Sequence, residues 1–438
     1  MQPSLFENTM VDPVFEHNAR EHSIPLRDMD VGDITFLSGQ NEPIHRWYRL
    51  TPSFSPGLVR FFLDKFNVTE RDLVLDPFSG RGTTMIECQR HALRGLGMEI
   101  NPLLQRVGQY SLEWCDLDSE SAAQYMSVVK AKVRSAKDAD PQEIAALYGA
   151  RIPDIHDVYR WWKPLVLRDL LIAREELAQS QFAKFRHLLW LAVNTASLEC
   201  ANIHRNHPTI TFDDDHDRDI DAVAAIQTML ETIVSDCTAI TGDQRASVGK
   251  CSVELGNSCL PLPAAHPANG SVSCVITSPP YPNRYSYVHQ TRPQLHFMEV
   301  IQHRSAATDI DLETVGGTWG KATSNLMKSL ITPPPKIAET LSYFERLSAK
   351  STLMCNYATK YFIDLDRHIE SLKAAVLPGK FRGAYVVGNS RLSDVEIFTE
   401  TILARLFQRH GFAVDEILVF RKRGGRKRLY ETAVVVRA

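Results

Sequence analysis

Two glycines after an apolar stretch form the first group of residues that could do chemistry. Gly80 and Gly82 belong to LDPFSGRGTT, residues 75–84, which leads from a short apolar run into helical spacing. A strand that turns into a helix through glycines lets the backbone come close to a ligand. A phosphate-binding loop would add a lysine, and a dinucleotide site would read G-x-G-x-x-G, but this segment has neither pattern. It therefore predicts either a site for a nucleoside without phosphates or a purely structural turn.

An acidic residue at the end of the next apolar run favours the nucleoside. Glu99 lies near the end of GLGMEI, which follows the helical stretch after the glycines. In doubly wound folds, a carboxylate at this place accepts hydrogen bonds from ribose hydroxyls. We therefore expect Glu99 to bind both hydroxyls of a ribose.

A second group of residues follows another apolar run. In VITSPPYPNRY, residues 275–285, a buried strand leads into Ser278, Pro279, Pro280 and Tyr281. The hydroxyl of Ser278 and the carbonyl of Pro279 can accept hydrogen bonds from the amino group of a base, and the prolines fix the direction of that carbonyl. Tyr281 offers a ring on which an extruded base can stack. A proline turn that only ends a strand is the alternative.

Together these motifs resemble those of the S-adenosylmethionine-dependent DNA amino methyltransferases, in particular the N4-cytosine enzymes of restriction-modification systems. The resemblance covers residues 46–104 and 252–438 and implies S-adenosylmethionine as cofactor. It assigns contacts with this cofactor to Phe54, Ser55, Asp76, Phe78, Ser79, Gly80, Gly82, Thr83, Glu99, Ile100, Asn257 and Ser258. Asn257 stands where family members usually have aspartate, but an amide can still hydrogen-bond to an adenine edge.

The segment TSPPY is similar to the catalytic motif of this family, which makes residues 278–281 the expected catalytic residues. Its serine favours cytosine N4, because the adenine N6 enzymes more often begin the motif with aspartate or asparagine. The expected reaction is in-line methyl transfer to a flipped base, without a covalent intermediate, because no cysteine lies in the Pro-Cys context of the C5-cytosine enzymes. The alternatives are N6-adenine methylation of DNA, N2-methylation of guanine in RNA, and a catalytically silent DNA-binding module.

Double-stranded DNA is the expected partner, and a cognate restriction endonuclease acting separately is a further one. Arg284 follows Tyr281 closely enough to reach a phosphate beside the flipped nucleotide, and Arg292 lies in the same region. The segment RKRGGRKR, between two β-rich runs, predicts a cationic hairpin tip that contacts phosphates. Its expected DNA contacts are Arg421, Lys422, Arg423, Arg426, Lys427 and Arg428. Trp161 and Trp162 are more typical of a core than of DNA contact.

The elements around these motifs predict an α/β fold. We expect a doubly wound, mostly parallel sheet of the class I methyltransferase type, with a C-terminal antiparallel hairpin and a helical insertion. The expected units are an N-terminal arm (1–45), a catalytic domain (46–110 and 246–438) and the insertion (111–245), which could recognise DNA. Residues 300–350, with GGTWG and TPPPK, predict a loop that is mobile or that recognises DNA.

Composition excludes several classes of protein. The 438 residues carry a net charge of -3, so binding to nucleic acid has to come from local patches. No apolar run is long enough to cross a bilayer, and the first residues do not form a secretory signal, so we expect a cytoplasmic, nucleoid-associated protein without membrane contact. The eight cysteines are scattered, and no metal site is expected.

Overall fold

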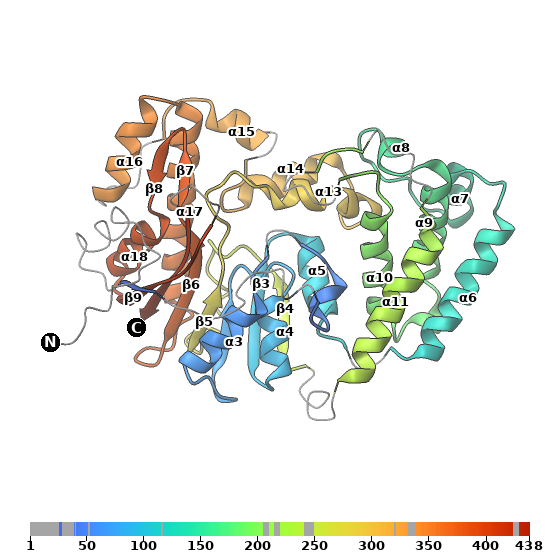
Figure 1. Ribbon diagram of the computed structural model, residues 1–438, viewed down its shortest axis with the longest axis horizontal. Helices are drawn as coiled ribbons and strands as arrows, with labels where there is room; N and C mark the ends of the chain where they lie inside the picture. Colours follow the sequence, from blue (N-terminus) through green and yellow to red (C-terminus); the bar gives the residue numbers. More distant parts are fainter. Residues whose placement is uncertain are drawn as a thin grey trace.

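An eight-stranded sheet forms the centre of the computed structural model (Figure 1). The strand order is β1-β9-β10-β6-β5-β2-β3-β4, in which β6, β5, β2, β3 and β4 run parallel and β10 runs antiparallel to both of its neighbours. The structure describes residues 26–28, 39, 41–50, 53–114, 117–204, 210–213, 220–240, 249–318, 321–331, 338–423 and 429–438. The strands are β1 (Leu26–Asp28), β2 (Leu73–Asp76), β3 (Arg94–Glu99), β4 (Cys251–Leu255), β5 (Cys274–Thr277), β6 (Arg382–Gly388), β9 (Ala413–Lys422) and β10 (Tyr430–Arg437), while β7 (Ser390–Leu392) and β8 (Val395–Ile397) form a separate pair.

The inner strands are apolar on both sides because helices cover both faces of the sheet. Along β2, Val74 belongs to one hydrophobic cluster and Leu75 to the other, and Ile276 and Val275 of β5 divide in the same way. From β2 the chain continues to β3 and β4 on one side, and then returns to β5 and β6 on the other. A doubly wound sheet binds its ligands where this reversal occurs, at the carboxyl ends of the strands.

The helices that cover the two faces come from different parts of the chain. Those of the first hydrophobic cluster are α3 (Pro56–Lys65), α4 (Thr83–Arg90) and α5 (Pro102–Tyr110). Those of the second are α16 (Ala338–Ser348), α17 (Thr352–Lys373) and α18 (Thr399–Arg409). The doubly wound α/β fold predicted from the sequence is confirmed.

A helical lobe lies beside the sheet domain, in green and cyan in Figure 1. It contains α6 (Ser119–Ser135), α7 (Pro141–Tyr148), α8 (Val158–Trp161), α9 (Pro164–Glu176), η2 (Ser180–Phe182), α10 (Arg186–Glu199) and α11 (Ala222–Ala239). These elements occupy the residues expected to form the insertion. Trp161 and Trp162 are 1% and 0% exposed, so both belong to the core of the lobe.

The lobe and the sheet domain share one hydrophobic cluster and a buried carboxylate. Asp236 of α11 accepts hydrogen bonds from the backbone N–H of Ile44 and the indole N–H of Trp47, at 2.9 and 2.8 Å. The short helix η1 (His45–Trp47) is thereby attached to the lobe. The segment expected to be an N-terminal arm also contains β1, which pairs with β9 at the edge of the sheet.

Residues 300–350 differ from the expected loop. They contain α14 (Arg304–Glu313) and α15 (Lys321–Leu326), followed by α16 (Ala338–Ser348), and α13 (Tyr287–Phe297) precedes them. Gly316 and Gly317 lie in the connection after α14, whereas Gly320 and the prolines at 333–335 lie outside the described residues. The glycines and prolines of this segment hid its short helical stretches from the sequence prediction. Within the part of the chain that the structure describes, no helix is both long enough and apolar enough to span a bilayer.

Candidate active site

One cavity brings together the segments that the sequence singled out. It lies where the carboxyl ends of β2, β3, β4 and β5 meet, and the connection before α3 also contributes to its wall. The predicted site residues that line it are Phe54, Phe78, Ser79, Gly80, Thr83, Glu99, Ile100, Asn257, Ser258, Ser278, Pro280, Tyr281, Arg421 and Arg423. Residues from six separate stretches of sequence therefore face the same space.

Glu99 is one of three acidic residues that line this cavity, together with Glu313 and Glu431. Its side chain accepts hydrogen bonds from the backbone N–H groups of Gly80 and Asn101, each at 2.8 Å. The residue is only 9% exposed, and burial raises the pKa of Glu99 to about 7. The glycine turn and the end of β3 are thus joined through a carboxylate that changes charge near neutral pH.

The two glycines of the turn have different roles. Both have positive φ, 54° at Gly80 and 87° at Gly82. A Cβ at Gly80 would meet no atom within 4 Å, because this residue faces the cavity. A Cβ at Gly82 would lie 2.9 Å from the Cα of Gly108 in α5. Gly82 therefore permits close packing of α5 and is not part of the cavity wall, contrary to the cofactor contact expected from sequence.

We expect Gly82→Ala to destabilise the fold by about 2–5 kcal/mol, which combines left-handed strain with overpacking against α5. Gly80→Ala, which adds a methyl group in open space, should cost only the strain, about 1–2 kcal/mol. Urea unfolding of both variants measures the difference. Equal losses of unfolding free energy would contradict the assignment of different roles to the two glycines.

Asp76 does not line the cavity, but its side chain connects two of the strand ends around it. Its carboxylate accepts hydrogen bonds from the hydroxyls of Thr84 and Thr277, both at 2.6 Å, and from the backbone N–H of Phe78. Burial raises the pKa of Asp76 to about 6. The side chain therefore joins the end of β2 to the end of β5. The predicted contact of Asp76 with a cofactor is replaced by this positioning role, because its oxygens are directed to neighbouring hydroxyls.

Two other predicted contacts lie just outside the cavity wall. Ser55 immediately precedes α3 and is buried, one residue after Phe54, which does line the cavity. Pro279 is buried beneath the tip, whereas Ser278, Pro280 and Tyr281 face the cavity.

Asn257 lines the cavity, and its side-chain oxygen accepts the N–H of Cys259 at 3.0 Å. Its amide NH₂ group is therefore the part suited to a ligand.

The tip after β5 is held by residues that the sequence did not reveal. The hydroxyl of Tyr361 in α17 donates to the carbonyl of Pro280 at 2.8 Å. One turn earlier, the hydroxyl of Tyr357 accepts the N–H of Arg284 at 3.0 Å, and Arg284 has a positive φ of 59°. The spacing of four residues between the tyrosines was the only available signal, since it places both on one face of a helix.

His368, farther along α17, supports the opposite wall. Its Nδ1 donates to the carbonyl of Ser258 at 3.2 Å, and its Nε2 accepts the hydroxyl of Tyr385 at 2.9 Å. Its ring also lies edge-on to Phe78, with 4.8 Å between ring centroids. Burial lowers the pKa of His368 to about 4, so the ring stays neutral. The helix α17 thus fixes three separate parts of the site.

The cationic residues proposed to contact DNA lie in different environments. Arg284 is exposed beside the tip, and Lys422 is exposed on β9. Arg292, in contrast, is half-buried, with its guanidinium 5.4 Å from the ring of Trp161. Burial lowers the pKa of Arg292, and this packing in the core is the reason to withdraw it as a DNA contact. Arg426, Lys427 and Arg428 lie outside the described residues.

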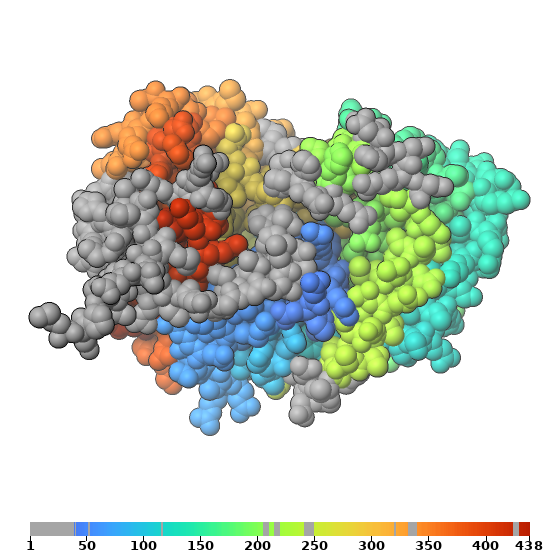
Figure 2. Space-filling model, viewed as in Figure 1, coloured from blue at the N-terminus to red at the C-terminus, as the bar shows by residue number. Residues whose placement is uncertain are grey.

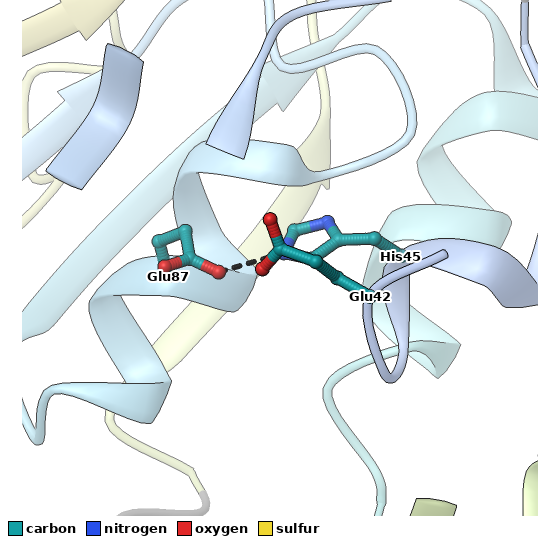
Figure 3. A group of neighbouring side chains, drawn as sticks. All are labelled: Glu42, His45 and Glu87. Carbon is teal, nitrogen blue, oxygen red and sulfur yellow. Dashed lines mark hydrogen bonds and ion pairs between the residues drawn. The ribbon is translucent and has the colours of Figure 1, made fainter. Parts of the chain in front are cut away.

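Glu42, His45 and Glu87 form a cluster in which His45 and Glu87 are buried and Glu42 is partly exposed (Figure 3). The His45 Nε2 and a Glu87 oxygen are 2.7 Å apart, and Arg60 contacts both glutamates, at 2.9 and 3.1 Å. Burial alone would raise the pKa of Glu87, but the hydrogen bond from His45 and the charges of Arg90 and Arg60 lower it to about 2. The bond between His45 and Glu87 joins η1 to α4. Because arginines already balance the charges of the carboxylates, the cluster is not suited to a metal ion.

The chain is similar to Type II methyltransferases. It is 21% identical over 447 residues to M.AvaI from Nostoc sp., which covers 94% of this chain and 87% of that protein. M.MvaI from Kocuria varians is 20% identical over 395 residues, or 86% of this chain and 83% of the relative. M.BsoBI from Geobacillus stearothermophilus is 21% identical over 306 residues, or 62% and 56%. This similarity supports methyl transfer as the chemistry of the chain.

Two further comparisons add nothing to this conclusion. No protein-family model matches the chain. Among solved structures, an rRNA methyltransferase, AviRa from Streptomyces viridochromogenes, overlaps with 91% of each chain at 10% identity. Its TM-score of 0.30 is too low to support a conclusion about fold or substrate.

Proposed function

We propose that this protein transfers a methyl group from S-adenosylmethionine to N4 of a flipped cytosine in double-stranded DNA. The observation that carries the proposal is a single cavity lined both by the glycine turn with Glu99 and by the serine-proline tip with Tyr281. A nucleoside site and a site for a base amino group therefore open into one space. The relatives, which are named Type II methyltransferases, support the same chemistry.

The residues around the glycine turn fit S-adenosylmethionine. Glu99 has oxygen lone pairs available for the two ribose hydroxyls, beyond those that accept the Gly80 and Asn101 N–H groups. Gly80 leaves open space where any side chain would intrude, and Phe78 and Ile100 supply apolar walls for an adenine. No phosphate-binding lysine adjoins the turn, which agrees with a nucleoside that carries none.

When bound, S-adenosylmethionine supplies a methyl group on a positively charged sulfur. The protein's own residues would hold the base that receives it. The hydroxyl oxygen of Ser278 can accept a hydrogen bond from the amino group, and Tyr281 can stack on the flipped ring. The bond from Tyr361 to the Pro280 carbonyl keeps the tip in one conformation, so a bound amino group would meet a preorganised acceptor. Holding and orienting the amino group are therefore the contributions of these residues.

The choice of cytosine rests on Ser278, since the adenine N6 enzymes that the sequence resembles more often have aspartate or asparagine there. Double-stranded DNA is the proposed partner, and Arg284 beside the tip is the proposed contact with a flanking phosphate. A restriction endonuclease acting on the same DNA sequence completes the proposed restriction-modification system. N6-adenine methylation, N2-guanine methylation of RNA and silent DNA binding remain outcomes of the test below.

Nucleoside analysis after methylation tests the proposal directly. The purified protein is incubated with tritiated S-adenosylmethionine and either plasmid DNA or total RNA, and the products are digested to nucleosides. We expect the label in N4-methylcytosine from DNA. Label in N6-methyladenine or N2-methylguanine would replace the proposed base with another, and no label despite DNA binding would favour a silent module. Sequencing the methylated plasmid then identifies the recognition sequence.

The affinity for S-adenosylmethionine should fall as the pH drops below 7. In the free protein the pKa of Glu99 is about 7, and only its ionised form accepts both ribose hydroxyls. Binding therefore favours the ionised form, and acidification through the pKa weakens binding, approaching tenfold per pH unit on the acid side. Calorimetric titrations from pH 8 to pH 5.5 measure this dependence. In Glu99→Gln the affinity for S-adenosylmethionine should not show this pH dependence. An equal change of affinity with pH in both proteins would contradict the assignment of Glu99 as the ribose ligand.

A further inference from the structure

The C-terminal hairpin carries charged residues into the proposed base site. Arg421 of β9 and Glu431 of β10 face each other in the register of the two strands. Both line the same cavity as Ser278 and Tyr281. In Figure 2, atoms from the C-terminal part of the chain, in red, are visible on this face of the molecule below the orange atoms. The hairpin therefore contributes to the site and is not confined to the outer surface.

A chain of hydrogen bonds connects the hairpin to the tip. The hydroxyl of Tyr281 donates to one oxygen of Glu431 at 3.3 Å, and the Nε of Arg421 donates to the other. The side chains of Arg421 and Glu431 are 36% and 12% exposed, so the carboxylate is largely enclosed and the guanidinium only partly. Glu431 thus fixes the position of Arg421 relative to Tyr281.

The neighbouring Arg423 has a different task. Its guanidinium lies 5.1 Å from the centre of the Tyr281 ring, and it donates through Nε to the Tyr430 carbonyl at 3.0 Å and through Nη2 to the Asn389 carbonyl at 2.5 Å. A Cβ at Gly388 would lie 2.2 Å from this guanidinium, so the glycine makes room for it. These two bonds hold the guanidinium of Arg423 over one face of the tyrosine ring. A stacked base is therefore left with the other face.

The terminal nitrogens of Arg421 are donors at the part of the cavity next to Tyr281 and Glu431. Only its Nε has a protein partner among the residues that the structure describes. When the amino group of a cytosine is bound at the tip, its N3 and O2 remain as two adjacent acceptors on the same edge of the ring. The forked donors of a guanidinium match such a pair, whereas adenine offers N1 next to a C–H group. Cytosine thus offers an acceptor to each of two guanidinium donors, whereas adenine offers an acceptor to only one.

We propose that Arg421, oriented by Glu431, is the specificity-determining residue that recognises N3 and O2 of the flipped cytosine. This inference rests on the proposed function. It moves Arg421 and Arg423 from the phosphate contacts expected on the sequence to the base site. It also gives the choice of cytosine a second basis that does not depend on Ser278.

The test compares cytosine with 3-deazacytosine, which keeps the amino group and O2 but has C–H in place of N3. Duplexes carrying either base at the methylated position are assayed for kcat/KM with the wild type, Arg421→Ala and Arg421→Gln. We expect the wild type to prefer cytosine by roughly 10- to 100-fold, the discrimination typical of a paired contact with a base. In Arg421→Ala this preference should fall to within about threefold. Arg421→Gln, which keeps one donor group, should lie between them.

The neighbouring Lys422 supplies the matched control. Its side chain is exposed, and Lys422→Ala removes a cation one residue away. A residue that only contacts phosphate should lower kcat/KM equally for both duplexes and reduce the salt dependence of binding. The inference is overturned if Arg421→Ala behaves in that way, with the wild-type preference retained. If the wild type methylates adenine or nothing at all, the proposed function fails first, and this outcome is visible in the nucleoside analysis before any variant is made.

Discussion

Replacing Glu99 with alanine should abolish measurable binding of S-adenosylmethionine, with a loss of affinity of at least about 100-fold. Two hydrogen bonds from ribose hydroxyls to a carboxylate would disappear, and bonds to charged groups contribute about 1.5–3 kcal/mol each. The same change removes the acceptor of the Gly80 and Asn101 N–H groups, so the turn would also lose its fixed position. Isothermal titration calorimetry at pH 8, where Glu99 is ionised, measures the effect.

The conservative variant and a surface control make this result specific. Glu99→Gln keeps one acceptor oxygen and should lose about 10-fold in affinity, between the wild type and the alanine variant. Glu70→Ala removes an exposed carboxylate outside the cavity and should bind normally. Far-UV circular dichroism checks that each variant is folded. Binding by folded Glu99→Ala within threefold of the wild type would show that the ribose lies elsewhere.

Replacing Ser278 with alanine should lower kcat by about 100- to 1,000-fold while leaving the affinity for S-adenosylmethionine within a few-fold. The expected size is that of losing one preorganised hydrogen-bonding group at a reaction centre. The affinity is preserved because Ser278 lies on the tip after β5, whereas Glu99 lies at the end of β3. Single-turnover methylation of a saturating DNA duplex separates the chemical step from binding.

Tyr281 and an exposed serine complete this comparison. Tyr281→Phe keeps the ring but loses the bond to Glu431, so it should be milder than Tyr281→Ala, which removes about 1–3 kcal/mol of stacking with the base. Ser342 is exposed on α16, and Ser342→Ala should have unchanged rates. If Ser278→Ala reacts as fast as the Ser342→Ala control, the amino group is held by other atoms.

Local sequence was sufficient for the fold and for part of the site. The short apolar runs and the glycine turn predicted the doubly wound sheet, because strand, turn and helix follow each other within about ten residues. It was not sufficient for the direction of individual side chains. Asp76 and Gly82 belong to the expected motif, yet one joins two strands and the other packs against α5, since neighbouring residues of a turn face different surroundings.

The contributions of distant segments could not be read from the sequence. Tyr361 and His368 reach the site because α17 lies on one face of the sheet, and nothing near them in the chain indicates their partners. The hairpin was predicted, but its position next to β6 follows from the order of strands in the sheet. That order brings Arg421 to the cavity, whereas sequence alone suggested a tip that contacts phosphates.

The position of the helical lobe between β3 and β4 has a consequence for how the protein folds. β4 pairs with β3 in parallel, so Glu99 lies beside Leu255, although the whole lobe intervenes in the sequence. Such long-range pairing slows folding, because the entropy lost in closing a large loop comes before the favourable contacts between the strands form. During synthesis on the ribosome, β2 and β3 therefore emerge long before the strand that completes this side of the sheet. The lobe can form its own helices in that interval, which would shorten the loop that remains to be closed.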